Sequence, residues 1–211
     1  MNLRVFLIDF RDQITYYLLL GLKLKGCKTV LDVGCGTHSP IAKIKKTFYA
    51  EGVDIFGPSL KTAKASKIHD KYVQGNILEI DKIYRNKKFD GVILLDVIEH
   101  LKKKDGFEML KKMESIAKKK VIVVTPSGFL PQEAFDNNPY QKHISGWTVS
   151  DFNKKGYTCF GIKGLISLRQ EKSVNIRYKP AVFWGFIALL SEVVAYFSPK
   201  KAFMLMAVKE V

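Results

Sequence analysis

Residues 30–36 read VLDVGCG, and the expected type of fold follows from them. An apolar run ends in a loop with glycines at alternate positions, Gly34 and Gly36, and glycine lets a backbone turn sharply and lie against a ligand. Asp32 places a carboxylate in the same turn. Asp54 places a second one at the end of the next predicted strand, where it can bind the hydroxyls of a ribose. These features predict a nucleoside-binding α/β protein.

The rest of the chain alternates predicted strands and helices, which is typical of a mainly parallel sheet covered on both faces. We expect strands at 28–33, 49–54, 68–73, 89–95, 120–125, 156–168 and 202–208. We expect helices at 10–24, 39–46, 59–66, 105–117 and 148–154, the second of them starting at an N-cap serine followed by proline. The long loop 126–147 is of the kind that often has a functional role, for example as a lid.

The amino-acid composition indicates the cellular location and the kinds of partner that we expect. The three cysteines form no CxxC pair and no zinc-ligand pattern, so we expect a reducing, cytoplasmic location and no metal site. Charged residues near the N-terminus interrupt the apolar run that a signal peptide would need. The net charge of +15 has two readings: an anionic partner, such as RNA or a membrane surface, or simply lysine-rich solvated faces.

Residues 181–197, AVFWGFIALLSEVVAYF, are apolar on nearly every side. A helix of this length spans about 25 Å, less than the roughly 30 Å hydrocarbon core of a bilayer. Three alternatives stay open: a helix packed on the domain, a helix lying in the plane of a membrane surface, and a membrane span.

The order LDVGCG, VDIF, GN, DVIEHL, VTPSG resembles the Rossmann-like (class I) S-adenosylmethionine-dependent methyltransferases, in particular the small-molecule group with an "EHL"-type motif after the fourth strand. The resemblance implies a doubly wound, mostly parallel seven-stranded sheet with helices on both faces and an antiparallel last strand. It also implies S-adenosyl-L-methionine as the cofactor. The residues that it assigns to cofactor binding are Asp32, Gly34, Cys35, Gly36, Asp54, Ile55, Asn76, Ile77, Asp96 and Val97.

The same resemblance places LLDVIEHL, residues 94–101, beside the transferred methyl group, and a later His-Trp passage near the substrate. His143 and His100 are therefore the candidate catalytic bases, because a base is needed only when the acceptor must lose a proton. Glu99 and His100 could equally form a structural pair. The motif of exocyclic-amine nucleic-acid methyltransferases is missing after the fourth strand. Asn138-Pro139-Tyr140 resembles a fragment of that motif, but it falls after the fifth strand and lacks one proline, so it is interpreted as a turn.

We expect one domain over 1–211, with an N-terminal helix region (1–27), a cofactor-binding core (28–130) and a substrate-side half (131–211). The predicted acceptor is a small or lipid-like molecule, methylated at oxygen or carbon, and residues 181–197 could bring the protein to a membrane surface. RNA methylation and a non-catalytic binding protein are the alternatives. A nicotinamide-dependent oxidoreductase conflicts with Asp32 and with the missing third glycine of GxGxxG.

Overall fold

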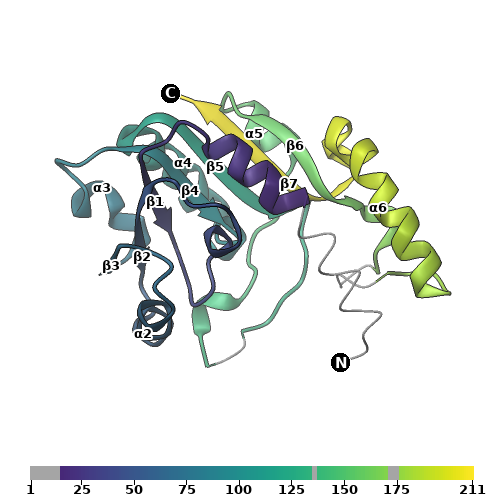
Figure 1. The fold of residues 1–211 in the computed structure, drawn as a ribbon, viewed down its shortest axis with the longest axis horizontal. Helices are drawn as coiled ribbons and strands as arrows, with labels where there is room; N and C mark the ends of the chain where they lie inside the picture. The colour runs from purple at the N-terminus through teal and green to yellow at the C-terminus, as the bar shows by residue number, and fades with distance from the viewer. Residues whose placement is uncertain (1–14, 135–136, 171–175) are drawn as a thin grey trace.

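The computed structural model describes residues 15–134, 137–170 and 176–211. In this part of the chain one sheet has the strand order β3-β2-β1-β4-β5-β7-β6 (Figure 1). Its strands are β1 (Thr29–Val33), β2 (Tyr49–Asp54), β3 (Lys71–Gln74), β4 (Phe89–Leu95), β5 (Ala117–Pro126), β6 (Thr158–Leu165) and β7 (Ala202–Glu210). The pairs from β3 to β5 are parallel, whereas β7 runs antiparallel to β5 and β6. The predicted fold class is confirmed.

Helices cover both faces of this sheet. Residues 15–24 are helical, and the longer elements after them are α2 (Gly57–Ser66), α3 (Ile80–Ile83), α4 (Lys103–Ile116), α5 (Val149–Asn153) and α6 (Ala181–Phe197). Neighbouring strand residues point to opposite sides, so Leu31 joins one apolar core, whereas Val30 joins the other. The first core contains the buried side of α4, and the second contains the buried side of residues 15–24.

The clearest differences from the predicted boundaries concern two elements. The helix expected at 39–46 is a 3-10 turn, Pro40–Lys43, although Ser39 caps it as predicted by accepting a hydrogen bond from the Ile41 N–H. The third strand is shorter than 68–73 and begins at Lys71. Residues 10–14 of the predicted first helix lie outside the described residues.

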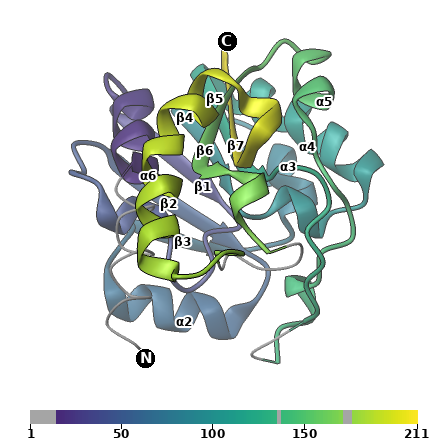
Figure 2. The same ribbon diagram turned by 90° about the vertical axis from the view of Figure 1, so that its right-hand side faces the viewer.

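The apolar segment 181–197 forms α6, which stands at the end of the molecule farthest from β3 (Figure 1) and packs on the edge strand β6 (Figure 2). Among the described residues, no helix has the length and apolar character needed to cross a membrane.

Candidate functional site: the loop after β1 and the cluster after β4

The loop after β1 has a backbone that requires glycine. Gly34 and Gly36 have φ angles of +71° and +53°, a region that side chains disfavour. A Cβ added at Gly34 would lie 2.7 and 2.9 Å from the two γ-carbons of Val97. A Cβ added at Gly36 would meet no atom of the described residues within 4 Å. Gly34 is therefore needed for packing, whereas Gly36 leaves space beside the loop.

Asp32 lies buried beneath this loop. Its Oδ2 accepts a hydrogen bond from the Ser39 hydroxyl at 2.5 Å and lies 2.8 Å from His69 Nε2. Both partners are buried as well. Asp32 therefore connects β1, the turn that follows the glycines and the segment before β3. Sequence reasoning missed His69, because a single histidine 37 residues away carries no motif.

Asp54 ends β2, as predicted, and is bonded to the glycine loop. Its Oδ2 accepts from the Gly36 N–H and its Oδ1 from the Phe56 N–H, both at 2.8 Å. Burial raises the pKa of this carboxyl, and the two backbone donors act in the opposite direction. Each oxygen has a second lone pair, so Asp54 can still accept hydrogen bonds from a ligand.

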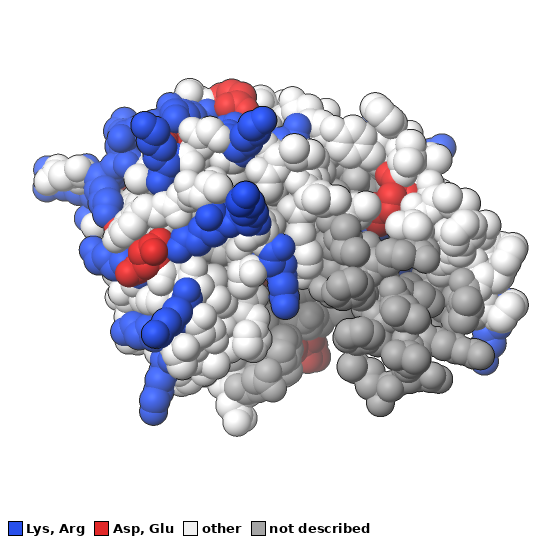
Figure 3. All heavy atoms as spheres, viewed as in Figure 1, with Lys and Arg blue, Asp and Glu red and all other residues white. Residues whose placement is uncertain are grey.

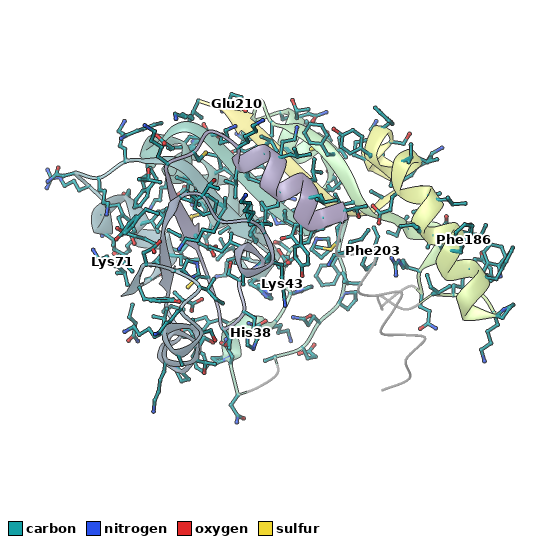
Figure 4. The ribbon with its side chains drawn as sticks, viewed as in Figure 1. His38, Lys43, Lys71, Phe186, Phe203 and Glu210 are labelled. Carbon is teal, nitrogen blue, oxygen red and sulfur yellow. The ribbon has the colours of Figure 1, made fainter. Side chains whose placement is uncertain are left out.

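A cavity of about 470 Å³ opens above the carboxyl ends of β1 and β4. Asp32, Gly34, Cys35, Gly36 and Asp96 are the predicted site residues in its lining. The other lining residues, which sequence reasoning did not assign, are Thr37, His38, Ser39, Pro40, Phe56, Pro58, Ser59, Thr62, Leu95, Asn138 and Gln141. His38 belongs to the loop near α2 (Figure 4). Ligands of open α/β sheets bind in such a crevice, beyond the carboxyl ends of the strands.

The lining of this cavity does not include the remaining predicted cofactor residues, which are Asp54, Ile55, Asn76, Ile77 and Val97. Asn76 caps a short turn, with its Oδ1 accepting from the Leu78 N–H at 3.0 Å. Its amide nitrogen is not used in that cap. Asn138 does border the cavity, and it caps the turn Pro139–Gln141 that the sequence interpretation expected.

Two acidic residues, Asp96 and Glu99, follow the end of β4, and the first of them also lines the cavity. Asp96 has a φ of +55°, which is rare for a residue with a side chain. Glu99 is buried, and its Oε2 accepts from the Thr125 hydroxyl at 2.9 Å. Burial raises the pKa of Glu99 to about 8, and the nearby Asp96 charge acts in the same direction. Burial also raises the pKa of Asp96, although part of its side chain remains exposed to solvent. The charges of Lys163 and His143 act in the opposite direction and lower this pKa.

The two predicted histidines pack against each other here, with ring centroids 4.7 Å apart. His143 Nδ1 lies 2.6 Å from the Leu130 carbonyl, and His100 Nδ1 lies 3.1 Å from the Lys142 carbonyl. A carbonyl only accepts, so each Nδ1 carries a proton, and in a neutral ring Nε2 keeps its lone pair. Burial lowers the pKa of His100, which favours its neutral form. His143 Nε2 is 4.0 Å from Glu99 Oε1.

Packing of the 143–147 segment brings these groups together. The Glu99 carbonyl accepts from the N–H groups of Ile144 and Ser145, at 2.9 and 3.0 Å. The indole of the fully buried Trp147 donates to the Ile98 carbonyl at 3.2 Å. These bonds join the end of β4 to a segment more than 40 residues later in the chain, so His143 lies beside Glu99 and His100.

Glu99, His100 and His143 are also the one group among the described residues whose ligand atoms could hold a metal ion, since they all lie within 4.8 Å of one another. Two imidazoles and a carboxylate suit a divalent transition metal. The same atoms suit proton transfer, so geometry alone allows both uses.

Comparison with known proteins identifies the fold. Residues 31–125 match the family model described as "Methyltransferase domain". The chain has the fold of a class I methyltransferase. The matched residues include the glycine loop, Asp54, Asp96, Glu99 and His100, but not His143, and they end at Thr125, the partner of Glu99. No curated protein sequence matches the chain significantly.

Three solved structures of methyltransferases resemble this chain over more than nine tenths of its length. A SAM-dependent methyltransferase from Archaeoglobus fulgidus has a TM-score of 0.61 at 20% identity, covering 95% of this chain and 94% of that one. Magnesium protoporphyrin IX methyltransferase from Synechocystis PCC 6803, solved with bound SAM, has a TM-score of 0.53 at 18% identity, covering 98% and 81%. The small RNA methyltransferase HEN1 has a TM-score of 0.57 at 21% identity, covering 93% and 24%.

Proposed function

We propose that this protein is an S-adenosyl-L-methionine-dependent methyltransferase that acts on a small or lipid-like acceptor, at oxygen or carbon. One observation carries the proposal: the cavity above β1 and β4 has both loop glycines and Asp96 in its lining, within the stretch that matches a methyltransferase domain. Its volume of about 470 Å³ lies in the usual range for a cofactor site.

The residues present suit this cofactor. The space beside Gly36 would be filled by a Cβ, so a ligand can approach the backbone there. Oδ1 of Asp32, which neither Ser39 nor His69 uses, is available for the ammonium group of the methionine part. Asp54 lies next to the loop with lone pairs to spare for ribose hydroxyls. A pyrophosphate would instead be repelled by Asp32, which argues against a dinucleotide.

When bound, the cofactor supplies a methyl group activated by a sulfonium, with a neutral leaving group. The chain then has to align the acceptor, exclude water and, for a hydroxyl, take up a proton. We assign proton uptake to Nε2 of His143, whose tautomer the Leu130 carbonyl fixes. Asp96 lines the cofactor cavity and is also close enough to His143 for an electrostatic interaction.

A second cavity, of about 300 Å³, supports an acceptor with an apolar body. Phe129, Leu130, Ile166 and Phe203 contribute apolar walls, and Arg169 and Arg177 also line it. His143 lies behind this wall, because the Leu130 carbonyl is its hydrogen-bond acceptor. We therefore assign this cavity to the acceptor rather than to the cofactor.

RNA is the second candidate acceptor, favoured by the net charge of +15 and by the similarity to a small RNA methyltransferase. A non-catalytic binding protein is the alternative to both. One experiment separates them: the purified protein is incubated with labelled methyl donor and either lipid and metabolite extracts or total RNA, and labelled products are identified by mass spectrometry. Label in an extracted small or lipid-like compound supports the proposal, whereas label in RNA identifies RNA as the acceptor. If no product is labelled although the protein binds S-adenosylhomocysteine, the protein is a non-catalytic binding protein.

A further inference from the structure

Helix α6 is attached to the sheet through small side chains. Its buried positions include Ala188, Ser191 and Ala195, which face β6. A Cβ added at Gly161 of β6 would overlap the carbonyl of Ala195, so the two backbones are in close contact. The Ser191 hydroxyl accepts from the Leu165 N–H at 3.1 Å. This tight, specific packing holds the helix in one orientation.

The outward side of α6 carries the large apolar side chains. Those exposed by half or more are Phe183 (56%), Phe186 (51%), Leu190 (55%), Val193 (65%), Val194 (50%) and Phe197 (78%). Steps of three and four residues separate most of them, which places them in one stripe along the helix. We call these six residues the α6 stripe. Phe186 is seen on the outer side of the helix in Figure 4. An ordinary surface helix has the opposite arrangement, and an exposed apolar surface of this kind is typical of an interaction site.

Basic and aromatic residues stand at both ends of the stripe. Lys179 lies before the helix and Lys200 and Lys201 lie after it, all exposed. Near the first end, the rings of Tyr178 and Trp184 lie 4.7 Å apart. Between these ends the surface where α6 lies is mostly uncharged, whereas lysines and arginines gather toward the other end of the molecule (Figure 3). Lysine and aromatic side chains around an apolar face are typical of helices that lie in a membrane interface.

We propose that the α6 stripe docks on the surface of an anionic lipid bilayer, with the helix axis in the membrane plane. Anionic headgroups complement Lys179 at one end of the stripe and Lys200 and Lys201 at the other. A second copy of this chain fits less well, because pairing two stripes, parallel or antiparallel, brings a basic end against a basic end. The inference deepens the proposed function, since docking would place the protein where a lipid-like acceptor resides.

Vesicle sedimentation without any methyl donor tests the docking. Wild type is mixed with vesicles of phosphatidylcholine alone or of phosphatidylcholine with phosphatidylglycerol. We expect binding to the anionic vesicles, weakened by salt, and a blue shift of the Trp184 fluorescence, because the other tryptophan, Trp147, is already buried. Leu190→Asp with Phe197→Asp, at positions that are 55% and 78% exposed, should lower vesicle affinity at least about tenfold. Leu22→Asp, at a position that is 67% exposed on another helix, is the matched control and should bind as wild type.

Wild type that stays in the supernatant with both vesicle types, or a stripe variant that binds as tightly as wild type, would overturn the proposal. A dimer in light scattering that the stripe variant dissociates, with no vesicle binding, would assign the stripe to a second copy. Calorimetry with S-adenosylhomocysteine in vesicle-free buffer tests the proposed function separately. A failure to bind vesicles therefore counts against the docking alone, and a failure to bind S-adenosylhomocysteine counts against the proposed function alone.

Discussion

Replacing Gly34 by alanine should destabilise the protein through two separable effects. The first is the φ of +71°, which costs an alanine about 1–2 kcal/mol. The second is the overlap of the new methyl with Val97, at 2.7 and 2.9 Å, where overpacking typically costs about 1–3 kcal/mol. Gly34→Ala should therefore lower the free energy of unfolding by about 2–5 kcal/mol.

Gly36→Ala is the matched control, because its φ is also positive and its Cβ would meet no described atom within 4 Å. It should cost only the backbone term, about 1–2 kcal/mol, yet weaken binding of S-adenosylhomocysteine, since the methyl fills the space beside the loop. The stability loss at Gly34 and the binding loss at Gly36 thus have different causes.

The Val97 overlap is measured by a double-mutant cycle in urea denaturation. In Gly34→Ala/Val97→Ala the overlap is relieved, so the double variant should be more stable than the sum of the two single changes predicts, by about 1–3 kcal/mol. Additive values, or equal losses for Gly34→Ala and Gly36→Ala, would refute the packing argument. Unchanged m-values across the four proteins are the control for an unaltered unfolding transition.

Four further predictions concern Asp54, Glu99, His143 and the response to EDTA. Asp54→Ala should raise the Kd for S-adenosylhomocysteine roughly 100-fold, as expected for the loss of charge-assisted hydrogen bonds; calorimetry with near-native binding would contradict this. The pKa of Glu99 is raised to about 8 in the folded protein, so the folded chain keeps a proton that the unfolded chain releases at lower pH. The contribution of Glu99 to the free energy of unfolding is therefore complete below about pH 4.3 and is lost as the pH rises through about 8. In Glu99→Gln the melting temperature should fall less steeply between about pH 4.3 and pH 8 than it does in wild type. Melting temperatures that change with pH in the same way in both proteins would show that Glu99 is not the cause. His143→Ala should lower kcat for a hydroxyl acceptor while leaving donor binding unchanged, and unchanged turnover would remove its role as base. Turnover should persist in EDTA; a loss that Mn²⁺ restores would instead assign Glu99, His100 and His143 to a metal ion.

Several features could be predicted from the sequence because they depend on neighbours along the chain. A buried apolar run followed by glycines specifies a strand and a tight loop, so β1, Gly34 and Gly36 were found without the structure. The acidic end of β2 and the turn at Asn138 follow from equally local rules. Pairing in the sheet then follows from the alternation of strands and helices, which leaves few arrangements that bury every apolar face.

Other features arose only from tertiary packing, because they join residues with no local relation. Asp32 has its partner in His69, and Glu99 faces His143, each across more than 35 residues, and no spacing rule selects those pairs. Composition also left three readings of residues 181–197 open. Because Gly161 and Gly164 of β6 have no side chain, the face of α6 with small residues can pack closely against this strand. That contact leaves Phe183, Phe186 and Phe197 on the outward face. Which side of an all-apolar helix faces solvent is decided by the shape of the surface it packs on, and hydrophobicity alone cannot specify it.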